Sequence, residues 1–132
     1  MRNPRNLFFL SALFVFAGVI HFMIPRSYAG IMPPWVPFPM EAVYLSGVAE
    51  ILGGLGLLLA PTRRLAATGL ITLLVAVFPA NVQMLINAVA GGASSLYVAA
   101  LVLRLPLQPL LIAWVYRSAV RDARSQLPRT NW

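Results

Sequence analysis

The residues of this 132-residue chain that could do chemistry stand singly inside its long apolar runs. They are an imidazole, a carboxylate, a carboxamide and a guanidinium: His21, Glu50, Asn81 and Arg104. A charged group near the centre of a membrane helix costs about 2.5–3.5 kcal/mol on insertion scales, so it rarely faces lipid. Together these side chains offer hydrogen-bond donors, acceptors and charge. Such a set suits binding of a polar head group or relay of a proton.

Other kinds of chemistry are disfavoured by composition. Cysteine is absent, which excludes disulfides, thiolate metal ligands and thiol relays. One histidine and one usable intramembrane carboxylate are too few ligands for a metal site. No pairing of a nucleophile with a base stands out. We therefore predict no metal site and no catalytic residue, and we expect no activity from the chain on its own.

The composition predicts an integral membrane protein. The chain is 60% hydrophobic and only 10% charged, whereas soluble domains carry about 25% charged residues. The net charge of +7 rests on arginines alone, which lie mostly at the ends of the apolar runs. Arginines in such positions orient membrane spans, so we expect the lipid bilayer and not nucleic acid as the partner.

The apolar runs predict an all-α, four-helix membrane bundle that forms a single domain over residues 1–132. Prolines and polar turns delimit the runs, and Pro25, Pro39 and Pro61 lie at their ends. Two prolines, Pro106 and Pro109, are predicted to break the fourth helix on either side of Gln108. The predicted helices cover residues 7–24, 42–60, 65–86 and 96–116, followed by a basic tail over 117–132.

Small residues surround the carboxylate of the second helix. Ser46, Gly47, Gly53 and Gly54 lie three or four positions from Glu50 and share a helical face with it. In lipid, small residues allow helix backbones to approach closely. We therefore expect Glu50 to point into the bundle, where neighbouring helices pack against it.

The connection over residues 26–40 is rich in proline and aromatic side chains, and we expect a non-helical loop on the outer side of the membrane. Two interpretations of it stay open. It is an aromatic belt at the headgroup level, or it is a lid in which Trp35 covers a site.

At a rise of about 1.5 Å per residue, the four polar residues fall between the middle and the outer third of a core about 30 Å thick. In one interpretation, Glu50 and Arg104 form a buried ion pair that fixes the helix register, and His21 and Asn81 complete its hydrogen bonds. In the other, the same residues line a pocket that opens outward. The predicted ligand-binding candidates are His21, Trp35, Glu50, Asn81, Arg104 and Gln108.

Several segments resemble the DoxX-like family of small membrane proteins. They are HFMIPRSYAGIMPPWVP, SGVAEILGGLGLL, TRRLAATGL, FPANVQM and LRLPLQPLLIAW, within residues 14–116. The resemblance implies a four-helix protein, of a family found mostly in bacteria, in which some members are associated with thiosulfate:quinone oxidoreductase and others with membrane redox complexes. The residues that match the polar positions of the family are His21, Glu50, Asn81 and Arg104.

This resemblance leads to two functional hypotheses. The first is an accessory subunit or a binder of a lipophilic molecule, with a quinone as the candidate, in a redox or stress pathway of the bacterial inner membrane. A redox partner protein in the membrane or periplasm, and a homo-oligomer, are both compatible with it. The alternative is a structural or chaperone-like membrane protein without a small-molecule ligand.

The arginine distribution predicts the orientation of the chain. The N-terminus, the second loop and the tail together hold eight arginines, whereas the first loop holds only Arg26 and the third loop none. Under the positive-inside rule we expect both termini to face the cytoplasm.

A reporter that is active only outside the cytoplasm should give a signal when fused at Gly92 and none when fused at Trp132. The reverse pattern would contradict this orientation.

Overall fold

The computed structural model describes residues 4–30 and 32–121, and the regular secondary structure of these residues is entirely helical. Four of the helices in this part are long and apolar enough to cross a membrane. This agrees with the all-α class and the four predicted spans. The elements are α1 (Pro4–Met23), α2 (Pro25–Gly30), α3 (Pro39–Leu58), α4 (Arg63–Ala90), α5 (Ser95–Val115) and the π-helical η1 (Tyr116–Arg121).

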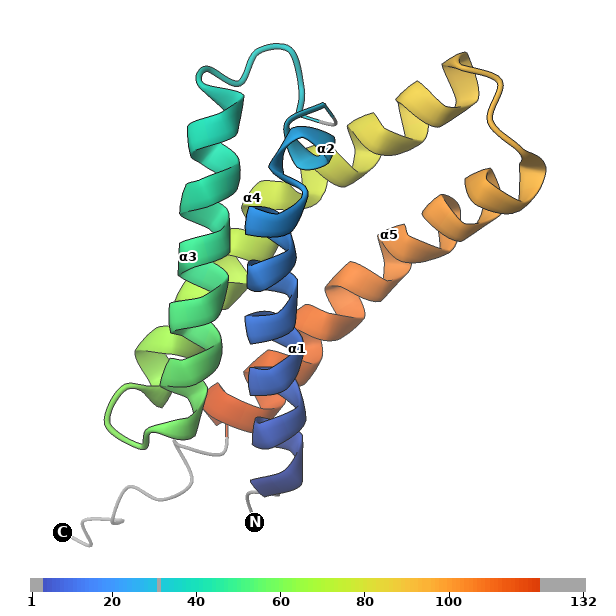
Figure 1. Ribbon diagram of the computed structural model, residues 1–132. Coiled ribbons are helices and arrows are strands. Elements are labelled where there is room, and N and C mark those ends of the chain that lie inside the picture. The colour runs from blue at the N-terminus through green and yellow to red at the C-terminus, as the bar shows by residue number, and fades with distance from the viewer. Residues whose placement is uncertain (1–3, 31, 122–132) are drawn as a thin grey trace, which may run out of the picture.

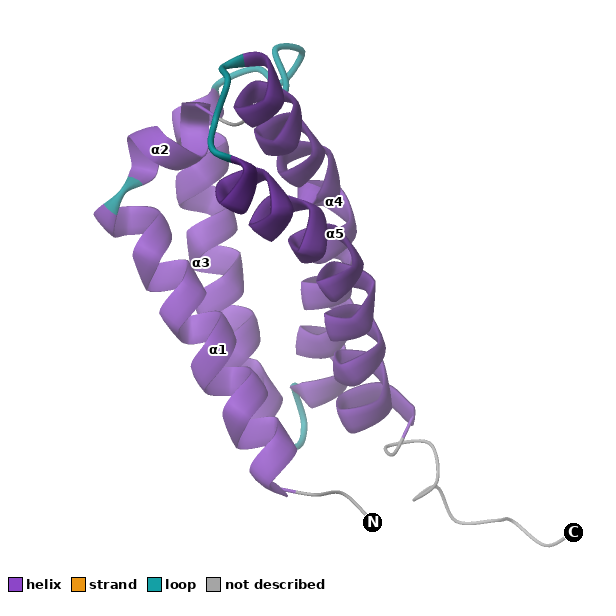
Figure 2. Cartoon of the chain, turned by 90° about the vertical axis from the view of Figure 1, so that its right-hand side faces the viewer, coloured by secondary structure: helices purple, strands orange, loops and turns teal. Residues whose placement is uncertain are grey.

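The long helices form two antiparallel pairs. α1 lies along α3, and α5 lies along α4, while α4 also packs on α3 (Figures 1 and 2). In Figure 1 the halves of α4 and α5 nearest their connecting turn slant away from α1 and α3. The two pairs therefore meet closely at the end where α1 begins and η1 ends, and they diverge toward the other end.

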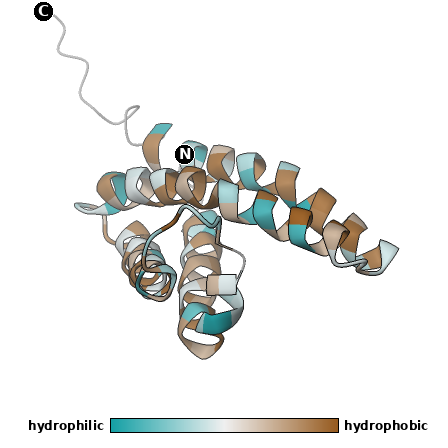
Figure 3. Cartoon of the chain, turned by 90° about the horizontal axis from the view of Figure 1, so that it is seen from above, coloured by the Kyte–Doolittle hydropathy of each residue, from teal (hydrophilic) through white to brown (hydrophobic). Residues whose placement is uncertain are grey.

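A compact apolar core occupies the end at which the pairs meet. Its buried residues come from the start of α1, the end of α3, the start of α4 and the α5–η1 junction. Leu10, Leu57 and Val115 are completely buried there. The outer faces of the helices are also apolar (Figure 3), with exposed side chains such as Phe8 and Leu103. Large exposed apolar surfaces of this kind suit contact with lipid.

Glycines bring α1 and α3 into backbone contact. A Cβ atom placed on Gly47 would lie 2.9 Å from Cβ of His21, and one on Gly54 would lie 2.9 Å from the carbonyl oxygen of Ser11. On α1, a Cβ atom on Gly18 would lie 2.7 Å from the carbonyl oxygen of Gly47. The expected close approach beside Glu50 is confirmed at these positions. Gly53 instead faces Leu70 of α4.

The prolines interrupt the helices less often than their number predicts. α5 is continuous from Ser95 to Val115 with Pro106 and Pro109 inside it, so the prediction of a broken fourth helix is wrong. Each proline removes only its own donor, and the neighbouring residues keep theirs. The first connection also differs from the predicted loop, because Pro25 begins the short helix α2. Proline is well suited to the first helical position, where its missing N–H has no helical partner.

The turn between α3 and α4 is closed by side-chain donors. Thr62 is the N-cap residue of α4, yet its hydroxyl donates to the carbonyls of Gly56 (3.0 Å) and Leu59 (3.3 Å) and not to the first turn of the helix. Arg63 Nε donates to the carbonyl oxygen of Leu57 over 2.7 Å. These bonds satisfy carbonyls at the end of α3 that have no helical partner. Of the predicted basic tail, residues 122–132 lie outside the described part of the chain.

The α1–α3 contact makes a matched pair of glycine substitutions informative. Gly54→Ala should lower the free energy of unfolding in detergent by about 1–3 kcal/mol, because the added methyl group meets the backbone of α1. Gly69→Ala, whose Cβ meets no heavy atom within 4 Å, should leave it unchanged or raise it by up to about 1 kcal/mol through helix propensity. Equal effects of the two substitutions would contradict the close packing.

Candidate functional site

A cavity of about 250 Å³ lies between the two helix pairs, bordering the apolar core at Phe14 and Leu74 and extending toward α2. Polar groups from α1, α2, α3, α4 and α5 and apolar side chains contribute to its lining. Five of the six predicted candidates line it: His21, Glu50, Asn81, Arg104 and Gln108.

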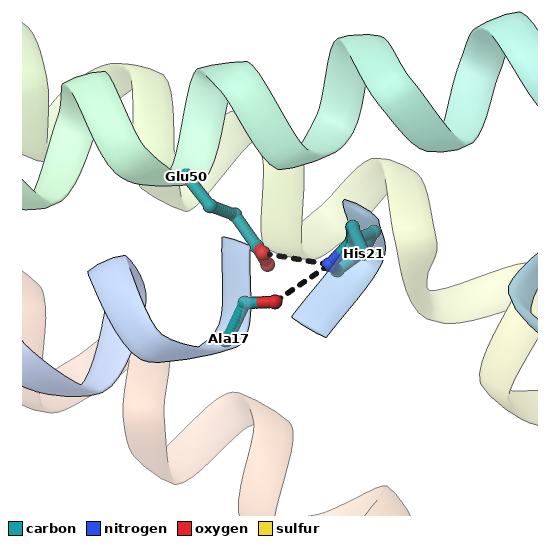
Figure 4. A network of polar contacts seen from close by, with 3 residues as sticks. All are labelled: Ala17, His21 and Glu50. Carbon is teal, nitrogen blue, oxygen red and sulfur yellow. Dashed lines mark hydrogen bonds and ion pairs between the residues drawn. The ribbon is translucent and has the colours of Figure 1, made fainter. Parts of the chain in front are cut away.

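On the α1–α3 wall, His21 and Glu50 contact each other. His21 Nδ1 lies 3.2 Å from Glu50 Oε2 and 2.8 Å from the carbonyl oxygen of Ala17 (Figure 4). His21 is 9% exposed and Glu50 is 8% exposed. Gly18 and Gly47 allow this contact, because they bring the backbones of α1 and α3 close enough for the side chains of His21 and Glu50 to touch. A buried carboxylate and imidazole in contact offset part of each other's desolvation cost.

The geometry assigns the proton on His21. A carbonyl oxygen can only accept a hydrogen bond, so the contact with Ala17 requires that Nδ1 carries a hydrogen. That hydrogen points to Ala17, and Glu50 Oε2 receives no hydrogen bond from any residue in the described part of the chain. Glu50 therefore contacts His21 and still retains a buried oxygen able to accept a donor.

Tyr28 of α2 completes this wall. Its ring stacks on the imidazole of His21, with ring centroids 4.1 Å apart and planes 15° from parallel. Burial raises the pKa of Tyr28 above its usual value, although the nearby Arg104 charge opposes the shift. The phenol therefore keeps its proton at neutral pH. The sequence interpretation did not select Tyr28, because a residue of an expected loop has no defined direction. The sequence feature that could have revealed the position of Tyr28 is Pro25, because a proline can occupy the first position of a new helix.

A chain of amides crosses the opposite wall between α4 and α5. Asn81 Nδ2 donates to Gln108 Oε1, and Gln108 Nε2 donates to the carbonyl oxygen of Leu74. Leu74 is next to Val75, whose carbonyl would normally accept from the N–H of the residue four positions later. That residue is Pro79, which has no N–H, so the Val75 carbonyl lacks its helical donor. The bond from α5 therefore reaches the carbonyl next to the one that Pro79 leaves without a helical donor. The Gln83 side chain, which also follows Pro79, donates to Asn87 Oδ1.

Arg104 does not form the predicted ion pair with Glu50. The only ion pair that the described residues give Glu50 is with His21. Arg104 Nη1 lies 3.9 Å from Met84 Sδ, and the side chain is exposed at the edge of the cavity. The physical reason is that α5 packs on α4 and slants away from α3, so the guanidinium acts on Glu50 across the cavity without touching it.

Trp35 does not cover the cavity, as the lid interpretation of the first connection required. It is 72% exposed and is not part of the cavity lining, whereas Tyr28 and Met32 are. The residues that line the cavity come earlier in the connection than Trp35, because the helix α2 begins directly at Pro25 and places Tyr28 in the cavity lining. The lid interpretation of Trp35 is therefore wrong in its geometry, and the closing residues come from α2 and the segment that follows it.

The family of the chain follows from a comparison with known proteins. The family described as Domain of unknown function (DUF8561) matches residues 10–119, which include every residue that lines the cavity. The chain belongs to this family. No curated protein and no solved structure matches it. The matched range contains the whole site, so the cavity and its polar residues lie within the DUF8561 domain.

Two double-mutant cycles separate the observed contact from the one that was expected. Glu50→Gln combined with His21→Asn should show a coupling of about 1 kcal/mol or more in the free energy of unfolding, because the residues touch. Glu50→Gln combined with Arg104→Gln should show less than about 0.5 kcal/mol. Unfolding by sodium dodecyl sulfate in mixed micelles measures both. The opposite order would favour the Glu50–Arg104 pair.

Proposed function

We propose that this protein binds a lipophilic molecule with a polar head group, such as a quinone, in the bacterial inner membrane. It acts as a binding protein or accessory subunit in a redox or stress pathway, alongside a partner that carries out the chemistry. The resemblance of its motifs to the DoxX-like family supports this pathway. The arginine distribution supports an orientation with both termini in the cytoplasm.

The observation that carries the proposal is the division of the cavity into polar and apolar parts. His21, Glu50, Asn81 and Gln108 supply fixed hydrogen-bonding groups, while Leu13, Phe14, Val77 and Leu107 are among the apolar lining residues. Small-molecule sites are mostly apolar with a few convergent polar groups of this kind. An amphiphile with a compact polar head matches both parts.

The size and access of the cavity also favour a ligand. Its volume of about 250 Å³ far exceeds the roughly 30 Å³ that one water occupies in the liquid. It is slightly below the range of about 300–1,000 Å³ for drug-sized ligands, so it suits a head group whose tail extends outside. Leu13 of α1 and Leu107 of α5 line the cavity and are also exposed. A tail leaving between these helices would enter the lipid.

The alternative is a structural or chaperone-like protein without a ligand. A purely structural polar cluster would be expected to satisfy its own hydrogen bonds. Glu50 Oε2 contacts His21 but accepts no hydrogen bond from the described residues, and the Arg104 guanidinium is exposed. Both features favour a site that binds a further molecule. These two groups distinguish the cluster from a sealed ion pair.

Filling the cavity tests the proposal. Ala17 lines the cavity, whereas Ala12 lies on the same helix, is exposed and does not line it. Ala17→Leu should weaken binding of decylhydroquinone, titrated without oxygen, to the purified protein in nanodiscs by about tenfold or more, because the added side chain occupies the space of the head group. Ala12→Leu should leave the affinity unchanged. Isothermal titration calorimetry provides the measurement.

Absence of saturable binding by the unsubstituted protein would overturn the binding proposal and favour the structural alternative. Equal weakening by Ala12→Leu and Ala17→Leu would also contradict it, because binding would then occur on the lipid-facing surface.

A further inference from the structure

The α1–α3 wall of the cavity offers a buried acceptor that lacks a donor. Glu50 Oε2 accepts no hydrogen bond from the described residues, although Glu50 is only 8% exposed. Its neighbour His21 directs the Nδ1 hydrogen to the carbonyl oxygen of Ala17, and Nδ1 is therefore not free to serve Oε2. A buried oxygen without a donor is costly, so it favours any ligand that supplies one.

The α5 side of the same cavity offers donors that lack an oxygen acceptor. The contact that the described residues give the Arg104 guanidinium is a thioether sulfur, Met84 Sδ, at 3.9 Å. Sulfur is a weak acceptor, and a guanidinium carries five N–H donors. The charge of Arg104 acts on both Glu50 and Tyr28 without a direct ion pair. A ligand oxygen placed beside Arg104 would therefore gain a charge-assisted hydrogen bond.

We propose that the bound molecule is a hydroxylated amphiphile, whose head group donates a hydroxyl hydrogen to Glu50 Oε2 and presents a second oxygen to Arg104. This inference rests on the proposed binding function and specifies its ligand class. The two protein groups lie on different helix pairs and line one cavity, so the head group must carry its donor and its acceptor on opposite sides. A ring with two para oxygens, at least one of them a hydroxyl, satisfies this requirement.

The same argument predicts what the site rejects. Sites built to hydrogen-bond a ligand hydroxyl discriminate strongly against analogues without it, since the buried partner is then left unpaired. Other groups of the lining, including Tyr28 and Ser46, carry hydroxyls of their own. They can accept from a ligand as well as donate, so they do not by themselves select for a donor. The selection depends on Glu50, which in its ionised form accepts hydrogen bonds and donates none.

A matched pair of probes isolates the donor. Decylhydroquinone and its dimethyl ether have the same ring, tail and oxygen positions, but only the first can donate a hydrogen bond. The unsubstituted protein in nanodiscs, titrated without oxygen, should bind decylhydroquinone about tenfold more tightly than the ether. Equal affinities, or tighter binding of the ether, would overturn the inference and leave the binding function in place. Failure to bind either probe would overturn both.

Matched variants then assign the two ends of the ligand. Glu50→Gln should reduce the preference for the hydroquinone to less than about threefold, because the introduced amide can both donate and accept. Glu41→Gln, which changes an exposed carboxylate outside the cavity, should retain it. A preference that survives Glu50→Gln would reflect only the size of the methyl groups and would overturn the assignment.

Arg104→Gln should weaken the binding of both probes by a similar factor, and Arg64→Gln, at the exposed start of α4, should weaken the binding of neither. Unchanged binding in Arg104→Gln would remove the acceptor contact from the proposal.

Discussion

The structure depends on the close approach of α1 and α3. Gly18, Gly47 and Gly54 leave no room for a Cβ atom between the two backbones. This spacing brings His21 within 3.2 Å of Glu50 and keeps both side chains away from the surface. A carboxylate in a membrane helix needs such a partner, because lipid solvates charge poorly. Without the glycines, larger side chains would separate the helices and leave Glu50 in an apolar environment.

The second helix pair determines the shape of the space that this carboxylate faces. α4 and α5 are joined by the Asn81–Gln108 amide contact and by the bond from Gln108 to the Leu74 carbonyl. The pair packs on α3 near the apolar core and slants away from it farther along. One end of the bundle is therefore tightly packed, and the other retains a cavity with polar groups on both walls. The cavity results from helix tilt and not from small side chains alone.

This arrangement gives the two charged groups of the cavity different environments. Glu50 is buried against a helix contact that holds it in place, while Arg104 lies exposed at the edge. A direct ion pair between them would fix the register of α3 against α5 and close the space. Because they remain apart, each keeps unused hydrogen-bonding capacity toward the cavity. Glu50 and Arg104 are thus the groups that would face a bound molecule in the function proposed above, whereas Asn81 and Gln108 join α4 to α5.

Much of this protein can be predicted from its sequence, because the determining features are local. Long apolar runs predict the four helices, and glycines at helical spacing from Glu50 predict a close helix contact beside it. The partners of the polar side chains depend on how the helices tilt against one another, and only the tertiary structure decided them. It paired Glu50 with His21 instead of Arg104, kept α5 continuous through its two prolines, and placed Tyr28 at the cavity instead of Trp35. Residue spacing defines the face on which a side chain lies, but the packing of distant segments decides what that face meets.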